Sequence, residues 1–163
     1  MTRIATLRSD PAALFLVERH LELTPDHLDV NNHTGIDRSR PLSLEDMAVP
    51  DIARGNCYAA TFALLFHLHC TALIERDLRG TLHEATVHFG PVGADIRRVP
   101  RHRAAAVSFG GDTVVIDHTY RQFVPSAPVP LVLFHADWLD AVTRDGERTF
   151  ARPLAGASLE RYR

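Results

Sequence analysis

The feature that most constrains the fold of this chain is a long apolar segment over residues 57–78. Its apolar side chains lie all round the helix that they predict: Phe62, Leu65, Phe66, Leu68, Leu73 and Ile74. A helix that is apolar on every side is usually buried on every side. Asn56 is a typical N-cap residue and Gly80 a typical stop. The segment therefore predicts a central buried helix that begins at Cys57.

Beyond Gly80 the pattern changes from helical spacing to strands. We expect strands over residues 82–89, 102–109, 113–117 and 129–134, then a short helix over residues 135–144. Residues 90–93 and 110–111 are rich in glycine and are typical of turns. Helices first and an antiparallel sheet afterwards indicate the α+β class.

The N-terminal third has weaker patterns. Apolar residues at helical spacing after Pro11 predict a helix over residues 11–23. Residues 25–52 are rich in Pro, Asp, Asn and Ser, and they predict a long loop with one helical turn over residues 42–47. A loop of this length in a compact domain is usually functional, and we expect it to line the cleft of the cysteine that follows.

We therefore expect one domain in three parts. Residues 1–54 form an N-terminal helix and loop, residues 55–150 form the core, and residues 151–163 form a C-terminal tail. A chain of 163 residues buries enough surface to fold without a disulfide or a metal.

Composition excludes several classes of function. A net charge of −2 offers no attraction for nucleic acid or for an anionic membrane. No segment approaches about 18 uninterrupted apolar residues, and no apolar signal core follows Met1, so we expect neither a membrane span nor a secretory peptide. All 18 basic residues are arginine, so no lysine is present for a Schiff base.

The two cysteines, Cys57 and Cys70, lie on the same predicted helix. At about 1.5 Å per residue they are roughly 20 Å apart, too far for a disulfide. Free thiols indicate a reducing compartment. We therefore expect a cytoplasmic protein, or one delivered by a route that needs no signal peptide.

The residue types of cysteine nucleophile chemistry occur in the order Cys57, His102, Asp117. A thiol with a pKa near about 8.5 is a weak nucleophile at neutral pH. At a helix start the thiolate meets the positive end of the macrodipole and unpaired N–H groups, which can also stabilise an oxyanion. An imidazole takes the proton and an acid orients the imidazole. We expect an enzyme with this triad, and neither cofactor nor metal.

The predicted hairpin places two of these residues on one face. If residues 110–111 form a two-residue turn, His102 faces Thr119 on the returning strand. Side chains alternate, so Asp117 shares a face with His102 at a diagonal separation of about 7–8 Å. An imidazole and a carboxylate can bridge that distance. A slip of one residue would instead bring His118 to His102.

These segments resemble the bacterial papain-fold toxins, a group that includes glutamine-deamidating toxin and effector domains. The similarity begins with Gly55-Asn56-Cys57 before an apolar helix. It continues with a histidine, two strands and Asp117-His118-Thr119-Tyr120-Arg121-Gln122-Phe123, which keeps the Asp, Thr, Gln and Phe of the family motif. The resemblance covers roughly residues 55–123.

The resemblance implies a papain-like fold, with the nucleophile helix packed on an antiparallel sheet. It implies attack of Cys57 on a carboxamide, with His102 as base then acid and Asp117 orienting it. With water as acceptor the outcome is glutamine deamidation, our leading hypothesis. An amine acceptor gives transglutamination and a peptide substrate gives proteolysis, both through the same thioester. A non-catalytic interaction module of the same fold is the alternative of another class.

The same resemblance implies partners. A protein is the expected substrate, and an immunity or chaperone protein is a further candidate. We expect no nucleic-acid and no membrane partner.

Some neighbouring residues are further candidates. Papain-type proteases have a glutamine just before the cysteine, and this chain has none there, so Asn56, Gln122 and the loop over residues 25–52 are the candidates for oxyanion stabilisation or positioning. Gln122 is alternatively a structural residue that bonds a backbone group. A metal site is suggested by the close spacing of His67, His69 and Cys70, but only His67 and Cys70 share a helix face. We therefore expect Cys70 to be a buried structural residue.

Overall fold

The computed structural model describes residues 15, 18–19, 21–22, 24–30, 42–74, 81–89, 95, 97–98, 100–109, 112–146 and 158–161. Its elements, in chain order, are η1 (Glu45–Ala48), α3 (Pro50–Ala53), α4 (Cys57–Ile74), β1 (Thr81–His88), β2 (Arg101–Phe109), β3 (Asp112–Asp117), η2 (Tyr120–Gln122), β4 (Leu131–Phe134), α5 (His135–Gly146) and β5 (Ser158–Arg161). The chain is an α+β protein with an antiparallel sheet, as the sequence pattern predicts.

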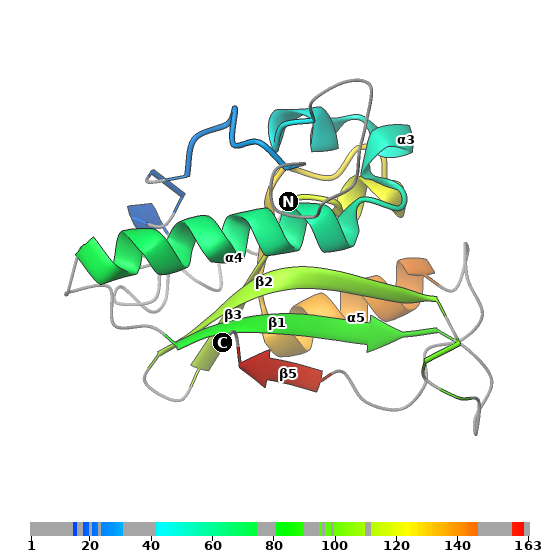
Figure 1. The fold of residues 1–163 in the computed structure, drawn as a ribbon. Coiled ribbons are helices and arrows are strands. Elements are labelled where there is room, and N and C mark those ends of the chain that lie inside the picture. The colour runs from blue at the N-terminus through cyan, green and yellow to red at the C-terminus, as the bar shows by residue number, and fades with distance from the viewer. Residues whose placement is uncertain are drawn as a thin grey trace.

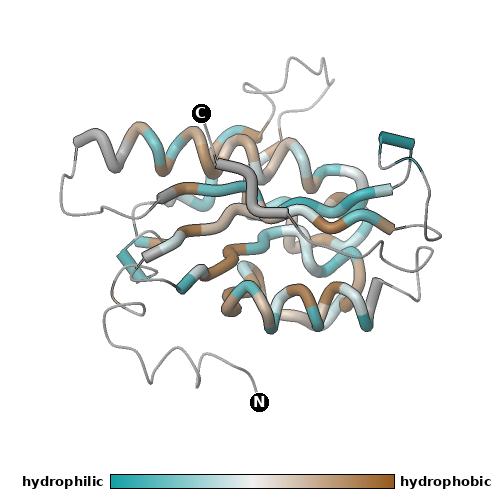
Figure 2. The backbone as a smooth tube through the Cα atoms, turned by 90° about the horizontal axis from the view of Figure 1, so that it is seen from below, coloured by the Kyte–Doolittle hydropathy of each residue, from teal (hydrophilic) through white to brown (hydrophobic). Residues whose placement is uncertain are grey.

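The sheet has five strands in the order β4-β3-β2-β1-β5, and all its neighbours pair antiparallel. Helix α4 packs on β1 and β2, whereas α5 packs on β3 and β4. The two helices cover opposite faces of the sheet (Figure 1), and the view from below shows the strands between them (Figure 2).

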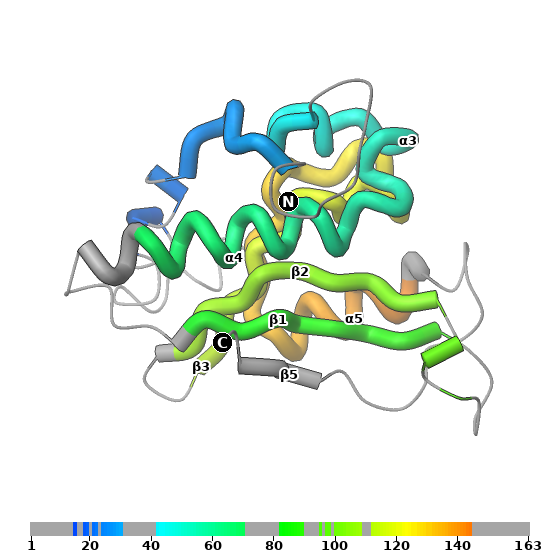
Figure 3. The backbone as a smooth tube through the Cα atoms, viewed as in Figure 1, coloured from blue at the N-terminus to red at the C-terminus, as the bar shows by residue number. Residues whose placement is uncertain are grey.

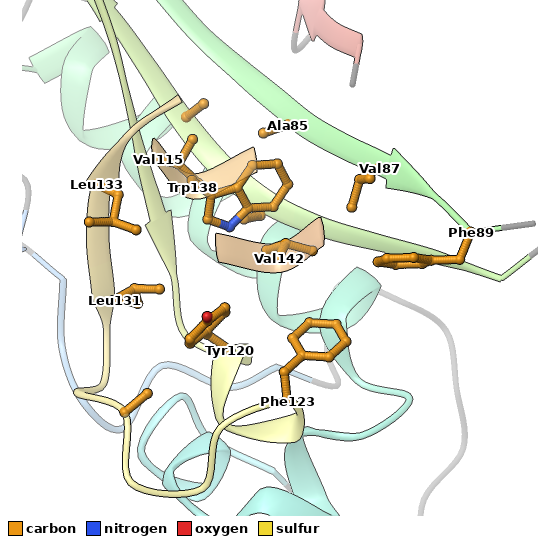
Figure 4. Close-up of a cluster of buried hydrophobic side chains, with 13 residues drawn as sticks. Ala85, Val87, Phe89, Val115, Tyr120, Phe123, Leu131, Leu133, Trp138 and Val142 are labelled. Carbon is orange, nitrogen blue, oxygen red and sulfur yellow. The ribbon is translucent and has the colours of Figure 1, made fainter. Parts of the chain in front are cut away.

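Strand β2 contributes side chains to two hydrophobic clusters, one on each face of the sheet. Its residues alternate, so Ala105 and Val107 belong to the cluster under α4, and Ala104 and Ala106 belong to the cluster around Trp138 of α5. Figure 4 shows the indole of Trp138 among the side chains of this second cluster. The small alanines leave room for α4 on one face of the strand and for the indole of Trp138 on the other.

Helix α4 is less buried than its composition predicts. Leu64, Leu65 and Leu68 are buried, but Phe66 on another flank is 41% exposed. Cys70 is exposed as well, so the expectation of a buried structural cysteine is wrong. The reason is geometric: the sheet and the N-terminal segments cover only part of the helix surface, and the remaining flank faces solvent although its residues are apolar.

The predicted strands and the last helix are present, with boundaries that differ by a residue or two. Of the helix predicted over residues 11–23, the five described residues are helical, and the remainder lies outside the described residues. The single turn predicted over residues 42–47 is instead two short helices, η1 and α3, and Pro50 starts the second. Proline suits a first helical position because its missing N–H would have no helical partner.

The expected C-terminal tail contains a strand. Residues of β5 pair with His83 to Thr86 of β1 and extend the sheet. Apolar and polar residues do not alternate in the segment Ser158–Arg161, so its sequence does not predict a strand. Backbone pairing at the sheet edge forms this strand, and a hydrophobic pattern is not required there.

Helices η1, α3 and η2 lie side by side near the start of α4, at one end of the molecule (Figure 3). Arg121 joins them, because its Nη1 donates to the carbonyl of Ala48 at 2.9 Å and its Nε donates to the carbonyl of Ala127 at 2.7 Å. No helix within the described residues is long and apolar enough to cross a membrane.

Replacing Leu65 by alanine tests the packing of α4 on the sheet. Leu65 is 1% exposed, so Leu65→Ala should lower the free energy of unfolding by roughly 2–5 kcal/mol through lost burial and a residual cavity. The neighbouring Phe66→Ala is the control and should cost much less, because Phe66 is already largely exposed. Chemical denaturation of both variants measures the difference, and equal losses would contradict this packing.

Candidate active site

Cys57 is the first residue of α4, directly after a tight turn from α3. Gly55 in this turn has φ of 81°, a left-handed conformation that glycine adopts without strain. A Cβ there would meet nothing within 4 Å, so backbone conformation, not space, requires the glycine. The turn delivers the thiol to the positive end of the helix.

Asn56 connects the two sides of this turn by hydrogen bonds. Its carbonyl accepts the first helical hydrogen bond, from the N–H of Ala60, as expected of an N-cap. Its side-chain nitrogen donates to the carbonyl of Ile52, while its Oδ1 is buried and receives no hydrogen bond from any described residue. The side chain therefore links α4 to α3 and does not cap the first turn, and its unpartnered oxygen is an acceptor, not an oxyanion donor.

The thiol of Cys57 lies against the open side of β2. The pairing of β2 with β1 reaches Arg101, whereas its pairing with β3 runs only from Phe109 to Ala105. Beyond that point β3 diverges, and Sγ of Cys57 lies 3.9 Å from the carbonyl oxygen of Arg101. The thiol thus lies at the part of β2 that β3 leaves unpaired.

His102 and Asp117 form a buried pair next to the thiol. Nε2 of His102 lies 2.7 Å from Oδ2 of Asp117, and each residue is 1% exposed. The hairpin register predicted from the sequence is confirmed by its first pair, Phe109 opposite Asp112. The same-face placement of His102 and Asp117 follows from this register.

The carboxylate of Asp117 accepts several hydrogen bonds besides that of His102. Nε1 of Trp138 donates to Oδ2 at 2.9 Å. The backbone N–H and the hydroxyl of Thr119 donate to Oδ1 at 2.9 and 3.2 Å. A buried carboxylate stays ionised only when it is paired and hydrogen-bonded in this way.

Aromatic side chains hold the imidazole ring in place. Trp138 stacks on His102 with ring centroids 5.8 Å apart, and Phe123 meets it edge-on at 4.9 Å. The ring therefore has one orientation, with Nε2 toward Asp117 and Nδ1 toward the side of Cys57 and Gln122.

These contacts shift the three pKa values. Burial alone would raise the pKa of the Cys57 thiol, but the hydrogen bond and charge of His102 outweigh burial and lower it below 9.0. Burial opposes the charge of His102, yet Asp117 raises its pKa from 6.5 to about 10. For Asp117, burial is outweighed by His102 and the other donors, which lower its pKa. Both the lowered thiol pKa and the raised imidazole pKa favour transfer of the proton from Cys57 to His102.

Gln122 contacts Nδ1 of His102. Its Nε2 lies 3.0 Å from Nδ1 and donates to the carbonyl of Thr119 at 3.1 Å. The carbonyl can only accept, so it determines which end of the amide is the nitrogen. Both N–H groups of Gln122 are then used, one of them toward an Nδ1 that can accept only when unprotonated. A donor at Nδ1 favours the neutral imidazole over the imidazolium.

One wall beside the nucleophile combines an aromatic ring with charges. Arg103 lies over the ring of Tyr58 at 4.7 Å and donates to Glu84 at 3.0 Å. Tyr58 is 44% exposed and follows Cys57 directly. The exposed ring of Tyr58 and the charges of Arg103 and Glu84 therefore lie next to the nucleophile.

The structure therefore brings together the three residues expected from the sequence and adds others. Trp138, Thr119 and Phe123 hold the pair, but no sequence signal places the helix of Trp138 against the hairpin. Among the described residues no group of three or more His, Cys, Asp and Glu side chains is arranged to hold a metal ion.

Comparison with known proteins adds no assignment: no family model, no curated protein and no solved structure matches the chain.

Alkylation of the cysteines tests the thiolate. At about pH 6, where a free thiol is almost fully protonated, iodoacetamide should label Cys57 much faster than an unperturbed thiol. His102→Ala should remove this advantage, because His102 lowers the thiol pKa. Cys70, exposed on the same helix, is the internal control and should label equally in both proteins. Slow labelling of Cys57 that the mutation does not change would contradict the pairing.

Gln122→Ala tests the competition for Nδ1. Without the amide N–H of Gln122, protonation of Nδ1 is no longer opposed, and the imidazolium lowers the thiol pKa further. The pH at which Cys57 becomes reactive should therefore move to lower pH. The measurement is the alkylation rate as a function of pH, and Cys70 should not respond. A shift to higher pH would show that Gln122 acts mainly by holding the ring.

Proposed function

We propose that this chain is a papain-like cysteine hydrolase that deamidates a glutamine side chain of a protein substrate. The observation that carries the proposal is the buried His102, held at Nε2 by Asp117 and turned with Nδ1 toward the thiol of Cys57 at a helix start. The resemblance of residues 55–123 to papain-fold toxins supports a carboxamide substrate.

In the first half of the reaction the Cys57 thiolate attacks the carboxamide carbon. The oxyanion that forms faces the first N–H groups of α4, which have no partner inside the helix. His102 then gives the proton on Nδ1 to the amide nitrogen, the C–N bond breaks and ammonia leaves. The product is a thioester on Cys57, and His102 is neutral.

In the second half water replaces ammonia. Nδ1 of His102 takes a proton from water while the oxygen attacks the thioester carbon. The C–S bond breaks, the thiolate returns and a glutamate side chain is released. Overall one carboxamide and one water give one carboxylic acid and one ammonia, which become carboxylate and ammonium by proton transfer in solution, and His102 ends protonated as it began. Asp117 keeps the imidazolium oriented throughout.

Gln122 has a place in this cycle. Its N–H can donate to Nδ1 after ammonia has left, while the imidazole is neutral, and it must release the single lone pair of Nδ1 before water enters as nucleophile. It therefore prevents rotation of the ring when the attraction of the thiolate is absent.

Ammonia release from glutamine-containing proteins tests the proposal. Incubation with denatured casein should release ammonia and convert glutamine to glutamate without backbone cleavage. Mass spectrometry of the casein measures both the conversion and any cleavage. Cys57→Ala should abolish the reaction, and His102→Ala should lower kcat by roughly 10²–10⁴-fold. Cys70→Ala, the matched cysteine control, should leave the rate unchanged.

Other products would overturn deamidation in distinguishable ways. Peptide fragments would indicate a protease, and incorporation of an added amine in preference to water would indicate a transglutaminase. An unreactive Cys57 together with an unchanged substrate would indicate a non-catalytic interaction module.

A further inference from the structure

Two exposed arginines lie beside the nucleophile. Arg54 is in the turn that leads into Cys57, and Arg101 starts β2, where its carbonyl oxygen is 3.9 Å from Sγ of Cys57. The starts of α4 and β2 lie at the same end of the molecule (Figure 1). Within the described part of the chain, neither guanidinium group has a hydrogen bond or an ion pair.

The other arginines whose side chains the structure describes are all bonded. Their partners are carboxylates or backbone carbonyls: Arg19 with Glu22, Arg97 and Arg98 with Asp95, Arg103 with Glu84, Arg144 with Asp140, and Arg121 with the carbonyls of Ala48 and Ala127. Among these arginines, the unpaired guanidinium groups therefore occur beside the thiol, at a place where the fold makes no use of them for its own contacts.

Strand alternation puts the side chain of Arg101 on the face of the sheet where α4 begins. Arg101 and Arg103 share this face, because they are two residues apart in β2. Cζ of Arg103 lies 4.7 Å from the ring centroid of Tyr58, the second residue of α4. Arg101 is about 7 Å farther along the same face. Its guanidinium is therefore close to any substrate chain that brings a carboxamide to Sγ of Cys57.

The charge of this rim is opposite to that of the whole protein. Residues 50–58 and 95–103, the two segments that flank the thiol, contain five arginines and two aspartates, Asp51 and Asp95, and thus a formal charge of +3. Glu84, which pairs with Arg103, leaves the rim positive. The whole chain has a net charge of −2. A positive rim on a negative protein attracts anionic groups to one place and repels them elsewhere.

On the basis of the function proposed above, we propose that Arg54 and Arg101 select an acidic protein segment by binding carboxylates that flank the target glutamine. A guanidinium binds a carboxylate through two parallel N–H···O bonds, and among the described residues these two have no partner to release first. Segments with lysine or arginine beside the glutamine meet like charge at the same positions.

Protection of Cys57 from iodoacetamide measures peptide binding without turnover. Two peptides are compared, each with one central glutamine, flanked by glutamates in one and by lysines in the other. At low ionic strength and neutral pH, the acidic peptide should protect Cys57 at roughly tenfold lower concentration than the basic peptide. Sodium chloride at about 0.5 M should reduce this protection, because exposed charges are screened. Labelling of Cys70 in the same protein should not respond to either peptide.

Single variants locate the effect at the two arginines. Arg54→Gln and Arg101→Gln should each weaken protection by the acidic peptide a few-fold, and the double variant should lose the preference for this peptide. Arg19→Gln is the matched control, because it removes the same charge outside both flanking segments, and it should keep the wild-type preference. Circular dichroism confirms that each variant is folded.

The outcomes separate acidic recognition from deamidation, since ammonia release is measured with the same peptides. Protection by the acidic peptide without ammonia release would support acidic recognition and overturn deamidation. Ammonia release from both peptides with equal protection would overturn acidic recognition and support deamidation. Absence of protection, equal losses in Arg19→Gln and Arg101→Gln, or stronger protection by an oligonucleotide than by the acidic peptide would also overturn acidic recognition.

Discussion

The pair of His102 and Asp117 is the interaction on which the rest of this structure depends. Both side chains are almost fully buried, and a buried charge is costly unless it is paired and hydrogen-bonded. The partners come from separate segments: His102 from β2, Thr119 from the turn after β3 and Trp138 from α5. The need to satisfy one carboxylate therefore fixes how the sheet, the turn and the helix meet.

The shifted pKa values of Cys57 and His102 compensate each other in folding. A raised histidine pKa stabilises the fold fully below 6.5 and loses that effect as the pH rises toward about 10. A lowered thiol pKa adds stability as the pH rises toward 9.0. The raised histidine pKa favours an extra proton in the folded state, whereas the lowered thiol pKa favours one proton fewer. The two shifts therefore act on the pH dependence of folding in opposite directions, and each offsets part of the other.

The sequence predicts the local part of this arrangement and misses the part that depends on packing. The Gly110-Gly111 turn and strict alternation are enough to put His102 and Asp117 on one face, because both follow from the neighbouring backbone. The exposed flank of α4 and the strand β5 depend on which distant surfaces are available to cover or pair with them. Trp138 is similar: its hydrogen bond to Asp117 requires α5 to cross the sheet at one place, and periodicity contains no such information.

The divergence of β3 from β2 explains why a nucleophile has access to a buried histidine. The ladder of paired residues between the two strands ends at Ala105 and Ile116. Had it continued, Thr119 would lie opposite His102, and backbone hydrogen bonds would occupy the edge where Sγ of Cys57 meets the carbonyl of Arg101. A longer ladder would add pairing to the sheet but would exclude the helix start from this edge. The interruption thus removes pairing from the sheet and leaves this edge of β2 open to the thiol of Cys57.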